Sequence, residues 1–130
     1  MSAVLVDTDV VSYLFKKDSR AARYAEMLKG RQRLISFMTV AELYQWTAIH
    51  QWGAARIQRL EDHLQDGYTV LPFDVHVCRH WGEIRAECQR AGRPISAQDA
   101  WIAATALAFD VPLLTNNGDD FVAVSHLQLY

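Results

Sequence analysis

Short apolar runs alternate along this chain with stretches in which apolar residues recur at helical spacing. The apolar runs predict buried strands at residues 3–6, 34–37, 69–71, 112–115 and 124–129. The periodic stretches predict helices near residues 10–15, 19–28, 39–66, 75–90 and 96–109. Strands that alternate with helices in this way predict a parallel sheet covered by helices on both faces.

Local signals predict where several of these helices begin and end. Thr39 and Glu42 have the spacing of a capping box, and so do Ser96 and Asp99. Gly53 is expected to divide the stretch at 39–66 into two helices. The helix at 75–90 is expected to end near Gly92, because glycine commonly follows a helix end and a proline comes two residues later.

The size and composition of the chain predict one domain over residues 1–130. Of the 130 residues 51% are hydrophobic, which is enough for one sizeable core. No apolar run approaches about 18 residues and no signal-peptide pattern is present, so we expect a cytoplasmic protein with no membrane segment. Cys78 and Cys88 match no zinc or redox spacing and are expected to be ordinary thiols.

Charge is unevenly distributed along the chain. The net charge of −2 argues against a nucleic-acid binder with a conventional basic face. The segment from Lys16 to Arg33, however, contains seven basic residues and only two acidic ones, whereas no Lys or Arg follows Arg93. The basic segment could attract phosphate groups, or it could simply be a solvated helix face.

Acidic residues occur at several predicted junctions between strands and helices. Asp7 follows the first strand, Glu42 and Asp99 lie near predicted helix starts, and Asp119 and Asp120 follow the strand at 112–115. In a parallel α/β sheet these junctions meet along one edge, where binding sites are built. Each residue alone could be a helix cap or a turn residue, but together they predict a carboxylate cluster that binds a divalent cation.

The helix predicted at 96–109 makes Asp99 the most informative of these acids. This helix is apolar nearly all round and is therefore expected to be buried, with Asp99 its only charge before Asp110. A buried carboxylate is costly unless something positive or hydrogen-bonding meets it. The helix N-terminus would contribute about 0.3–2 kcal/mol, and a metal ion would contribute more. Trp101 on the same helix is expected to belong to the core.

Other kinds of site have little support. His76 and His80 are four residues apart, but Val77 stands where a zinc metalloprotease motif needs Glu. No Gly-rich phosphate loop and no Ser/His/Asp arrangement appears, so nucleotide cofactors and serine hydrolase chemistry are not predicted.

Four segments, in this order, carry a family resemblance that covers nearly the whole chain. They are Leu5 to Val11, Thr39 to Leu43, Ile95 to Ala106 and Leu113 to Phe121. Together they resemble the PIN-domain ribonucleases, specifically the VapC-type toxins of toxin–antitoxin pairs. The resemblance implies a three-layer α/β/α sandwich with a central, mostly parallel sheet. It also implies an endoribonuclease that depends on Mg²⁺ or Mn²⁺, a homodimer and a cognate antitoxin.

The resemblance also implies site residues. Asp7, Glu42 and Asp99 match acidic positions of the family directly. At the fourth position many relatives carry Asp, whereas this chain has Asn117, and Asp120 also corresponds to a frequent acidic position. The catalytic set is therefore expected to be Asp7, Glu42, Asp99 and Asp120, and the metal ligands Asp7, Asp99, Glu42 and Asn117.

Within that set, Asp7 and Asp99 are expected to bind the metal directly and Glu42 to orient a water or act as a base. Asp9 departs from the Asn that is usual in the family and adds a carboxylate that could raise a neighbour's pKa. The remaining expected contacts to water or RNA are Thr8, Asp9, Thr115, Asn116, Arg93 and the bases between Lys16 and Arg33. The expected antitoxin contacts are Tyr44, Trp46 and Trp52.

Two other functions remain as alternatives. The first is a catalytically silent domain that binds RNA or a protein, in which the acids are only structural. The second is an aspartate-based phosphatase, since Asp7-Thr8-Asp9-Val10 resembles the opening motif of haloacid-dehalogenase-type enzymes. The phosphatase is less favoured because it implies a late Lys, and no Lys follows Lys29.

Overall fold

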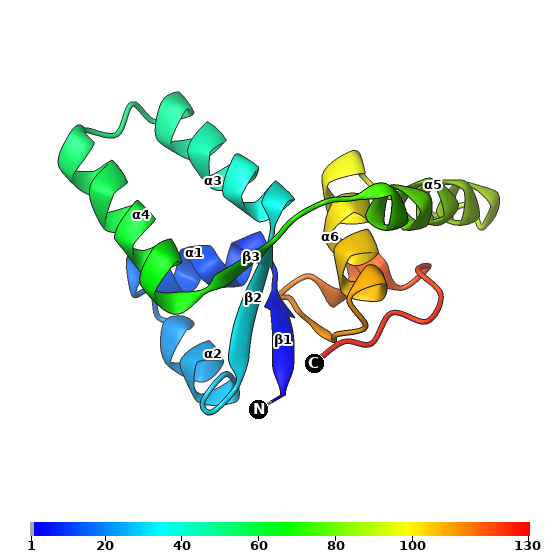
Figure 1. Cartoon of the computed structure of the whole chain (residues 1–130), viewed down its shortest axis with the longest axis horizontal. Coiled ribbons are helices and arrows are strands. Elements are labelled where there is room, and N and C mark those ends of the chain that lie inside the picture. Colours follow the sequence, from blue (N-terminus) through cyan, green and yellow to red (C-terminus); the bar gives the residue numbers. More distant parts are fainter. Residues whose placement is uncertain (1) are drawn as a thin grey trace.

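A parallel sheet of four strands forms the centre of the computed structural model, which describes residues 2–130 (Figure 1). The strands are β1 (Ala3–Val6), β2 (Gln32–Ser36), β3 (Thr69–Leu71) and β4 (Leu113–Leu114). Their spatial order is β3-β2-β1-β4, and every pairing between them is parallel. Leu5 of β1 lies opposite Leu34 of β2 on one side and Leu113 of β4 on the other. The predicted parallel sheet is confirmed.

Helices cover both faces of this sheet. Along residues 2–130 they are α1 (Thr8–Lys16), α2 (Ala21–Met27), α3 (Phe37–Ile49), α4 (Ala54–Gly67), α5 (Val75–Arg90), α6 (Ala97–Ala108) and the 3₁₀ turn η1 (Gly118–Phe121). In Figure 1, α1, α2 and α4 lie to one side of the strands, and α5 and α6 lie to the other. Helices α3 and α4 are joined at Gly53, as the sequence predicts, and form an arm that projects from the sheet.

The two faces of the sheet bury separate cores because successive strand residues point to opposite faces. In β1, Leu5 packs into the core beneath α5 and α6, whereas Val4 and Val6 pack into the core beneath α1, α2 and α4. In β4, Leu113 and Leu114 divide between the same two cores. The result is the three-layer α/β/α sandwich that the family resemblance implies.

Helix α6 is buried on most sides, as predicted. Its buried residues are Ala100, Ile102, Ala103, Ala104, Thr105 and Ala106. Trp101 stacks on Trp81 of α5 with ring centroids 4.9 Å apart, which agrees with the expected core role. Helix α5 has the predicted bounds, and Gly92 follows it with a left-handed φ of 72°. No helix among residues 2–130 is both long and apolar enough to cross a membrane.

The prediction of a strand at residues 124–129 is wrong. There the chain contacts the sheet through an isolated parallel bridge between Leu129 and Leu113. Upstream of that bridge, His126 takes a left-handed φ of 66° and the amide of Ser125 donates to the carboxylate of Glu87. Because a left-handed residue and an amide bonded to a side chain are incompatible with a regular ladder, the apolar residues here do not form a strand.

The predicted capping box at Thr39 is also wrong. Helix α3 begins two residues earlier, at Phe37, because Ser36 has extended backbone angles and its hydroxyl accepts a hydrogen bond from the amide of Met38 at 3.0 Å. Thr39 is therefore inside the helix, and Glu42 is not a capping residue. The second predicted cap is confirmed, since the hydroxyl of Ser96 accepts from the amide of Asp99 at 3.0 Å.

Candidate active site

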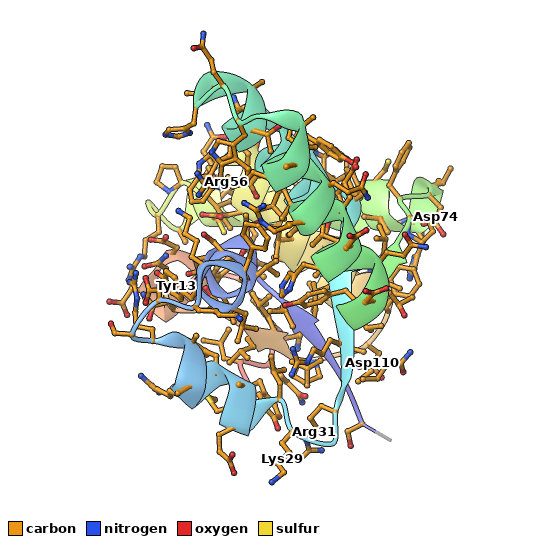
Figure 2. All side chains as sticks on the ribbon, turned by 90° about the vertical axis from the view of Figure 1, so that its left-hand side faces the viewer. Tyr13, Lys29, Arg31, Arg56, Asp74 and Asp110 are labelled. Carbon is orange, nitrogen blue, oxygen red and sulfur yellow. The ribbon has the colours of Figure 1, made fainter. Side chains whose placement is uncertain are left out.

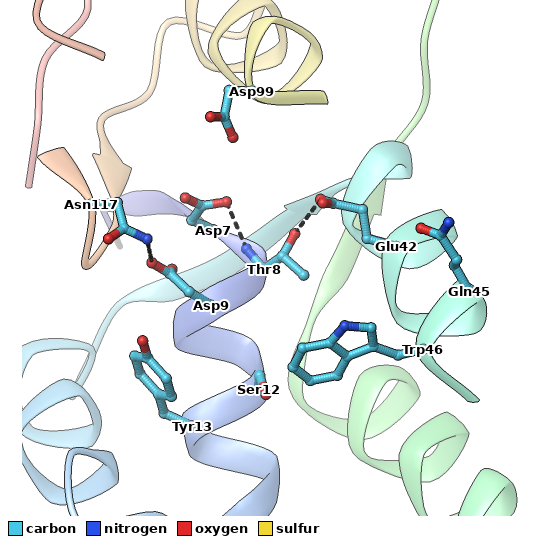
Figure 3. Close-up of a pocket in the computed structure, with 10 residues that line it drawn as sticks. All are labelled: Asp7, Thr8, Asp9, Ser12, Tyr13, Glu42, Gln45, Trp46, Asp99 and Asn117. Atoms are coloured by element: carbon cyan, nitrogen blue, oxygen red, sulfur yellow. Dashed lines mark hydrogen bonds between the residues drawn. The ribbon is translucent and has the colours of Figure 1, made fainter. Parts of the chain in front are cut away.

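A cavity of about 330 Å³ lies at the carboxyl edge of the sheet, where β1 leads into α1 and β4 leads into the loop at 115–117 (Figure 3). Its lining residues are Asp7, Thr8, Asp9, Ser12, Tyr13, Glu42, Gln45, Trp46, Asp99 and Asn117. Four of these residues carry carboxylates, and they come from α1, α3, α6 and the junction before α1. The sheet edge therefore gathers acids that are far apart in the sequence.

Asp7 is the most deeply buried of the four acids, with 6% of its surface exposed. It is the N-cap of α1, and its Oδ1 accepts from the amide of Thr8 at 2.7 Å. Its Oδ2 accepts from the hydroxyl of Thr115 on the opposite loop, also at 2.7 Å. Burial and the neighbouring charges of Asp9 and Asp99 raise the pKa of Asp7 to about 7, despite the two hydrogen bonds that favour the charged form.

Glu42 is held in the cavity by Thr8. The Thr8 hydroxyl lies 2.8 Å from Oε1 of Glu42 and 2.9 Å from the hydroxyl of Thr39. Because a hydroxyl has one proton, Thr8 donates to the carboxylate and accepts from Thr39. Burial, followed by the charges of Asp99 and Asp9, raises the pKa of Glu42, and the bond from Thr8 opposes this shift. These contacts point the Glu42 carboxylate towards Asp7, as Figure 3 shows.

Asp9 joins the first turn of α1 to the loop after β4. Its Oδ2 accepts from the amide of Asn116 at 3.1 Å and from Nδ2 of Asn117 at 3.0 Å. The amide of Asn117 in turn donates to the hydroxyl of Thr115, at 3.0 Å. Burial raises the pKa of Asp9, while hydrogen bonds from Val10, Asn116 and Thr115 act in the opposite direction. The expected contact residues on this loop therefore form one network with Asp9.

Asp99 enters the cavity from the first turn of α6. Burial raises its pKa first, followed by the charge of Asp120, while the side chain of Ser96 lowers it. Asp99 also lines a neighbouring cavity of about 420 Å³ together with Arg93, Asp119 and Asp120. Asp120 thus lies in the adjacent cavity, and Asp99 borders both. Asn117 and Asp120 were both expected near the fourth acidic position of the family. Of these two, Asn117 lines the same cavity as Asp7.

The electrostatics of the site favour a cation. The pKa values of Asp7, Glu42 and Asp99 are all raised, and no Lys or Arg is among the groups that shift them. A positive ion would relieve both the burial cost and the mutual repulsion. Within residues 2–130, no three His, Cys, Asp or Glu side chains form a ready-made ligand set for one ion. The carboxylates of Asp7 and Asp99 in this cavity suit Mg²⁺, which binds through one or two carboxylates and keeps several waters.

Three lining residues were missed by sequence reasoning. They are Ser12, Tyr13 and Gln45. Ser12 and Tyr13 each lie four positions after an expected site residue on α1, and a helix brings such residues to the same face. Trp46 stands in the same relation to Glu42 on α3, so helical spacing could have identified it as a cavity residue.

The basic segment between Lys16 and Arg33 does not form one surface. Arg20 makes an ion pair with Asp18 at 2.8 Å, and its guanidinium lies 3.5 Å from the ring centroid of Tyr13. Figure 2 shows Lys29 and Arg31 at the opposite end of the molecule from Arg56 on α4. Lys16, in contrast, lies over the ring of Trp46 beside the cavity, at 4.3 Å.

Comparison with known proteins agrees with this geometry. The sequence model of the family described as "PIN domain" matches residues 4–127. The chain is 31% identical over 126 residues to Ribonuclease VapC1 of Haemophilus influenzae strain R2866, covering 95% of this chain and 93% of that protein. It is 30% identical over 134 residues to the tRNA(fMet)-specific endonuclease VapC of Shigella flexneri, covering 98% and 96% of the two chains.

A solved structure is similar over the same length. The structure of VapBC-1 from nontypeable Haemophilus influenzae superposes with a TM-score of 0.83 at 30% identity, covering 98% of this chain and 96% of that one. The likeness therefore extends over the sheet, the helices on both faces and the edge that carries the acids.

Proposed function

The chain belongs to the PIN domain family, and from this premise we propose that it is a divalent-metal-dependent endoribonuclease that acts as the toxin of a toxin–antitoxin pair. The observation that carries the proposal is the gathering of Asp7, Asp9, Glu42 and Asp99 in one cavity, where no Lys or Arg lowers the pKa of Asp7, Glu42 or Asp99. The names of two relatives, a ribonuclease and a tRNA endonuclease, support RNA as the substrate.

Mg²⁺ or Mn²⁺ is the proposed cofactor, with Asp7 and Asp99 as direct ligands. Both carboxylates line the cavity, and oxygen ligands suit these ions. Glu42 and Asn117 complete the proposed set through intervening waters, since both side chains have oxygen atoms at the same cavity. When bound, the ion lowers the pKa of a coordinated water and offsets negative charge that develops on the phosphate.

The residues of the chain have separate tasks in this reaction. Glu42 takes the proton from the attacking water, since its carboxylate lines the cavity and the hydroxyl of Thr8 fixes its direction, while burial raises its pKa. The water oxygen forms the new bond to phosphorus, the bond from phosphorus to the leaving sugar oxygen breaks, and that oxygen takes a proton from solvent water. Thr115 and the amide of Thr8 hold Asp7 in place throughout.

Cleavage of RNA by the purified protein tests this proposal. Structured and unstructured RNAs would be incubated with Mg²⁺, with Mn²⁺ and with EDTA. We expect cleavage with either ion, none with EDTA, and a loss of at least about 100-fold in Asp7→Ala and Asp99→Asn. Asp110→Asn is the matched control, because Asp110 is exposed and lies away from the cavity (Figure 2), and asparagine accepts its left-handed φ of 54°.

Two outcomes would contradict the proposal. Equal cleavage by the wild type and by Asp7→Ala would exclude the metal mechanism. A protein that cleaves no RNA and shows no calorimetric binding of Mg²⁺ or Mn²⁺ would instead be the silent binding domain that the sequence left as an alternative.

An antitoxin protein is the proposed regulatory partner. The chain resembles VapC-type toxins, and its structure is similar to that of VapBC-1. A cavity with four carboxylates and raised pKa values would accept an Arg side chain from such a partner. Tyr44, which is 42% exposed, offers an apolar surface for the rest of the segment. Co-expression with the cognate antitoxin should give a complex that no longer cleaves RNA.

The resemblance also leads us to propose a homodimer that works in the cytoplasm, where RNA and an antitoxin are available. Val70, Phe73 and Val75, at the edge strand β3 and the start of α5, are large apolar residues that remain exposed. Light scattering after size-exclusion chromatography would give the mass in solution. A dimer that dissociates in Phe73→Glu would support this surface as the interface.

A further inference from the structure

The active-site cavity continues beyond Trp46 into a second hollow. Trp46 borders both the carboxylate cavity and a hollow of about 410 Å³ whose other lining residues are Lys16, His50, Trp52 and Arg56. A third hollow, of about 710 Å³, shares Lys16 and Arg56 with the second. It is further lined by Phe15, Lys17, Arg59, Asp62, His63 and Asp66. We call the second and third hollows together the aromatic groove.

Aromatic rings and cations alternate along the aromatic groove. Phe15 and Trp52 stack with centroids 5.9 Å apart and planes inclined by 23°. The guanidinium of Arg56, on α4, lies 3.8 Å from the ring centroid of Trp52. Trp46 is 36% exposed and lies beneath the ammonium group of Lys16. Its ring points from α3 towards α1 near Ser12 (Figure 3). These flat groups resemble the platforms on which unpaired bases stack.

The groove carries excess positive charge. Its basic lining residues are Lys16, Lys17, Arg56 and Arg59. Its acidic lining residues, Asp62 and Asp66, belong only to the third hollow, which Trp46 does not line. Within residues 2–130, the one ion pair joins Arg20 to Asp18, so no carboxylate lies within 4 Å of the groove cations. The groove thus complements a chain of phosphates, which the carboxylate cavity by itself would repel.

A single-stranded nucleic acid matches both properties of the groove. Its phosphates pair with exposed cations, and its bases stack on exposed rings. Lys16 and Lys17 favour a nucleic acid over a protein segment, because Lys is depleted at the centre of protein interfaces. The position is also suitable, since the groove opens at Trp46 directly beside Glu42 and Asp7.

We propose that the aromatic groove binds the single-stranded RNA that flanks the scissile phosphate. Trp46 and Trp52 stack bases, while Lys16, Arg56 and Arg59 contact phosphates. These are positioning residues, because they do not reach the reacting atoms. The proposal rests on the proposed ribonuclease function and names the part of the substrate that the cavity does not hold.

Binding and cleavage measured separately test this inference. The probe is a fluorescein-labelled oligouridine of about 12 nucleotides, within the span that such grooves cover, titrated in EDTA so that it is not cleaved. The variants are Lys16→Gln/Arg56→Gln, Trp46→Leu and the conservative Trp46→Phe. The matched control is Lys29→Gln/Arg31→Gln, because this pair has equal charge and lies at the opposite end of the molecule (Figure 2).

We expect about tenfold weaker binding in Trp46→Leu and recovery in Trp46→Phe, because stacking needs a flat ring. In Lys16→Gln/Arg56→Gln, affinity should fall and the slope of log K against log salt should shrink by about 1.4, at roughly 0.7 per phosphate contact. In cleavage assays KM should rise with little change in kcat, since these residues bind flanking RNA in the ground state and transition state alike. The control pair should behave like the wild type.

The possible results separate this inference from the proposed function. Wild-type cleavage with unchanged binding in all groove variants overturns the groove while leaving the ribonuclease intact. Groove-dependent RNA binding without metal-dependent cleavage overturns the ribonuclease and leaves the groove as an RNA site. Unchanged RNA affinity together with lost antitoxin inhibition assigns the groove to a protein partner instead. Trp46→Leu could unfold, but the exposed pair Lys16→Gln/Arg56→Gln still decides the outcome.

Discussion

Asn117 donates a hydrogen bond from its Nδ2 to Oδ2 of Asp9 over 3.0 Å, and this bond ties the loop after β4 to the first turn of α1. The family resemblance pointed to a missing acid at 117 and an additional acid at 9. The structure shows these two departures in direct contact. The negative charge at this corner of the cavity is carried by Asp9, and the neutral amide beside it serves as a donor.

Asn117→Asp should therefore lower the stability of the metal-free protein. The new carboxylate would lie next to that of Asp9, and their repulsion should lower the free energy of unfolding by about 1 kcal/mol, since position 117 is exposed. Saturating Mg²⁺ should reverse the loss. Urea unfolding with and without Mg²⁺ measures both effects. Asn117→Ala removes the hydrogen bond without adding charge, and an equal loss in the two variants would argue against repulsion.

Asp7→Asn should stabilise the metal-free protein at neutral pH. The pKa of Asp7 is raised from 3.8 to about 7, so the folded state binds a proton more tightly than the unfolded state. The stability that this tighter proton binding at Asp7 contributes is fully present below pH 3.8 and is lost as the pH rises through about 7. Asparagine avoids that loss, and the shift corresponds to at most about 4 kcal/mol.

Urea unfolding of both proteins between pH 4 and pH 7.5, in EDTA, measures this difference. The gain from Asp7→Asn should be small near pH 4 and should reach about 2–4 kcal/mol near pH 7.5. Added Mg²⁺ should stabilise the wild type more than the variant, because the variant lacks a ligand. A difference that does not change with pH would contradict the raised pKa.

Thr8→Val should lower both the rate of cleavage and the stability of the fold, each for a different reason. The valine removes the hydroxyl that donates to Glu42, so kcat should fall by about 10–100-fold, and Thr8→Ser should restore it. Stability should fall by about 1–3 kcal/mol, because the fully buried hydroxyl of Thr39 loses the acceptor that Thr8 provides.

The double variant Thr8→Val/Thr39→Val provides the control. Removal of both hydroxyl groups should recover much of the stability, whereas cleavage should remain slow because Glu42 still lacks its donor. Thermal melts and single-turnover cleavage measure the two properties. Recovery of both together would mean that Thr8 has no positioning role.

Ser36→Ala should lower stability by about 1–2 kcal/mol, because Ser36 caps α3 and its hydroxyl also donates to that of Thr105 in the buried core, whose own proton goes to the carbonyl of Trp101. Ser19→Ala is the matched control, since Ser19 is exposed and outside any helix. Urea unfolding gives both values. An unchanged midpoint in Ser36→Ala would contradict the observed start of α3.

Most of the sheet was predictable because its strands are short apolar runs between clear helical patterns. Helix α5 was predicted with its observed bounds, since Gly92 and Pro94 mark its end. The start of α3 was not predictable from pattern, because Ser36 and Thr39 are both good capping residues and only the buried position of Ser36 next to Thr105 decides between them.

The candidate site was likewise predictable only in part. The sequence predicted that Asp7, Glu42 and Asp99 would meet, because strand ends in a parallel sheet share one edge. It did not predict the contact of Asp9 with Asn117, which depends on how the loop at 115–117 folds back over α1. Trp46 was assigned to a partner surface, since its exposure and its place beside Lys16 become visible only when α1 and α3 are packed together.

The burial of α6 has a consequence for the reactive edge of the protein. Asp99 stands at the first turn of a helix in which Ala100 and Ala103 are fully buried. A methylene added at Ala100 or Ala103 would push the whole helix outward and move the carboxylate with it. Such a substitution in the core, far from the RNA, would then lower the rate of cleavage in a protein that still folds. The residues that pack around α6 and the residues of the active site would therefore have to evolve together.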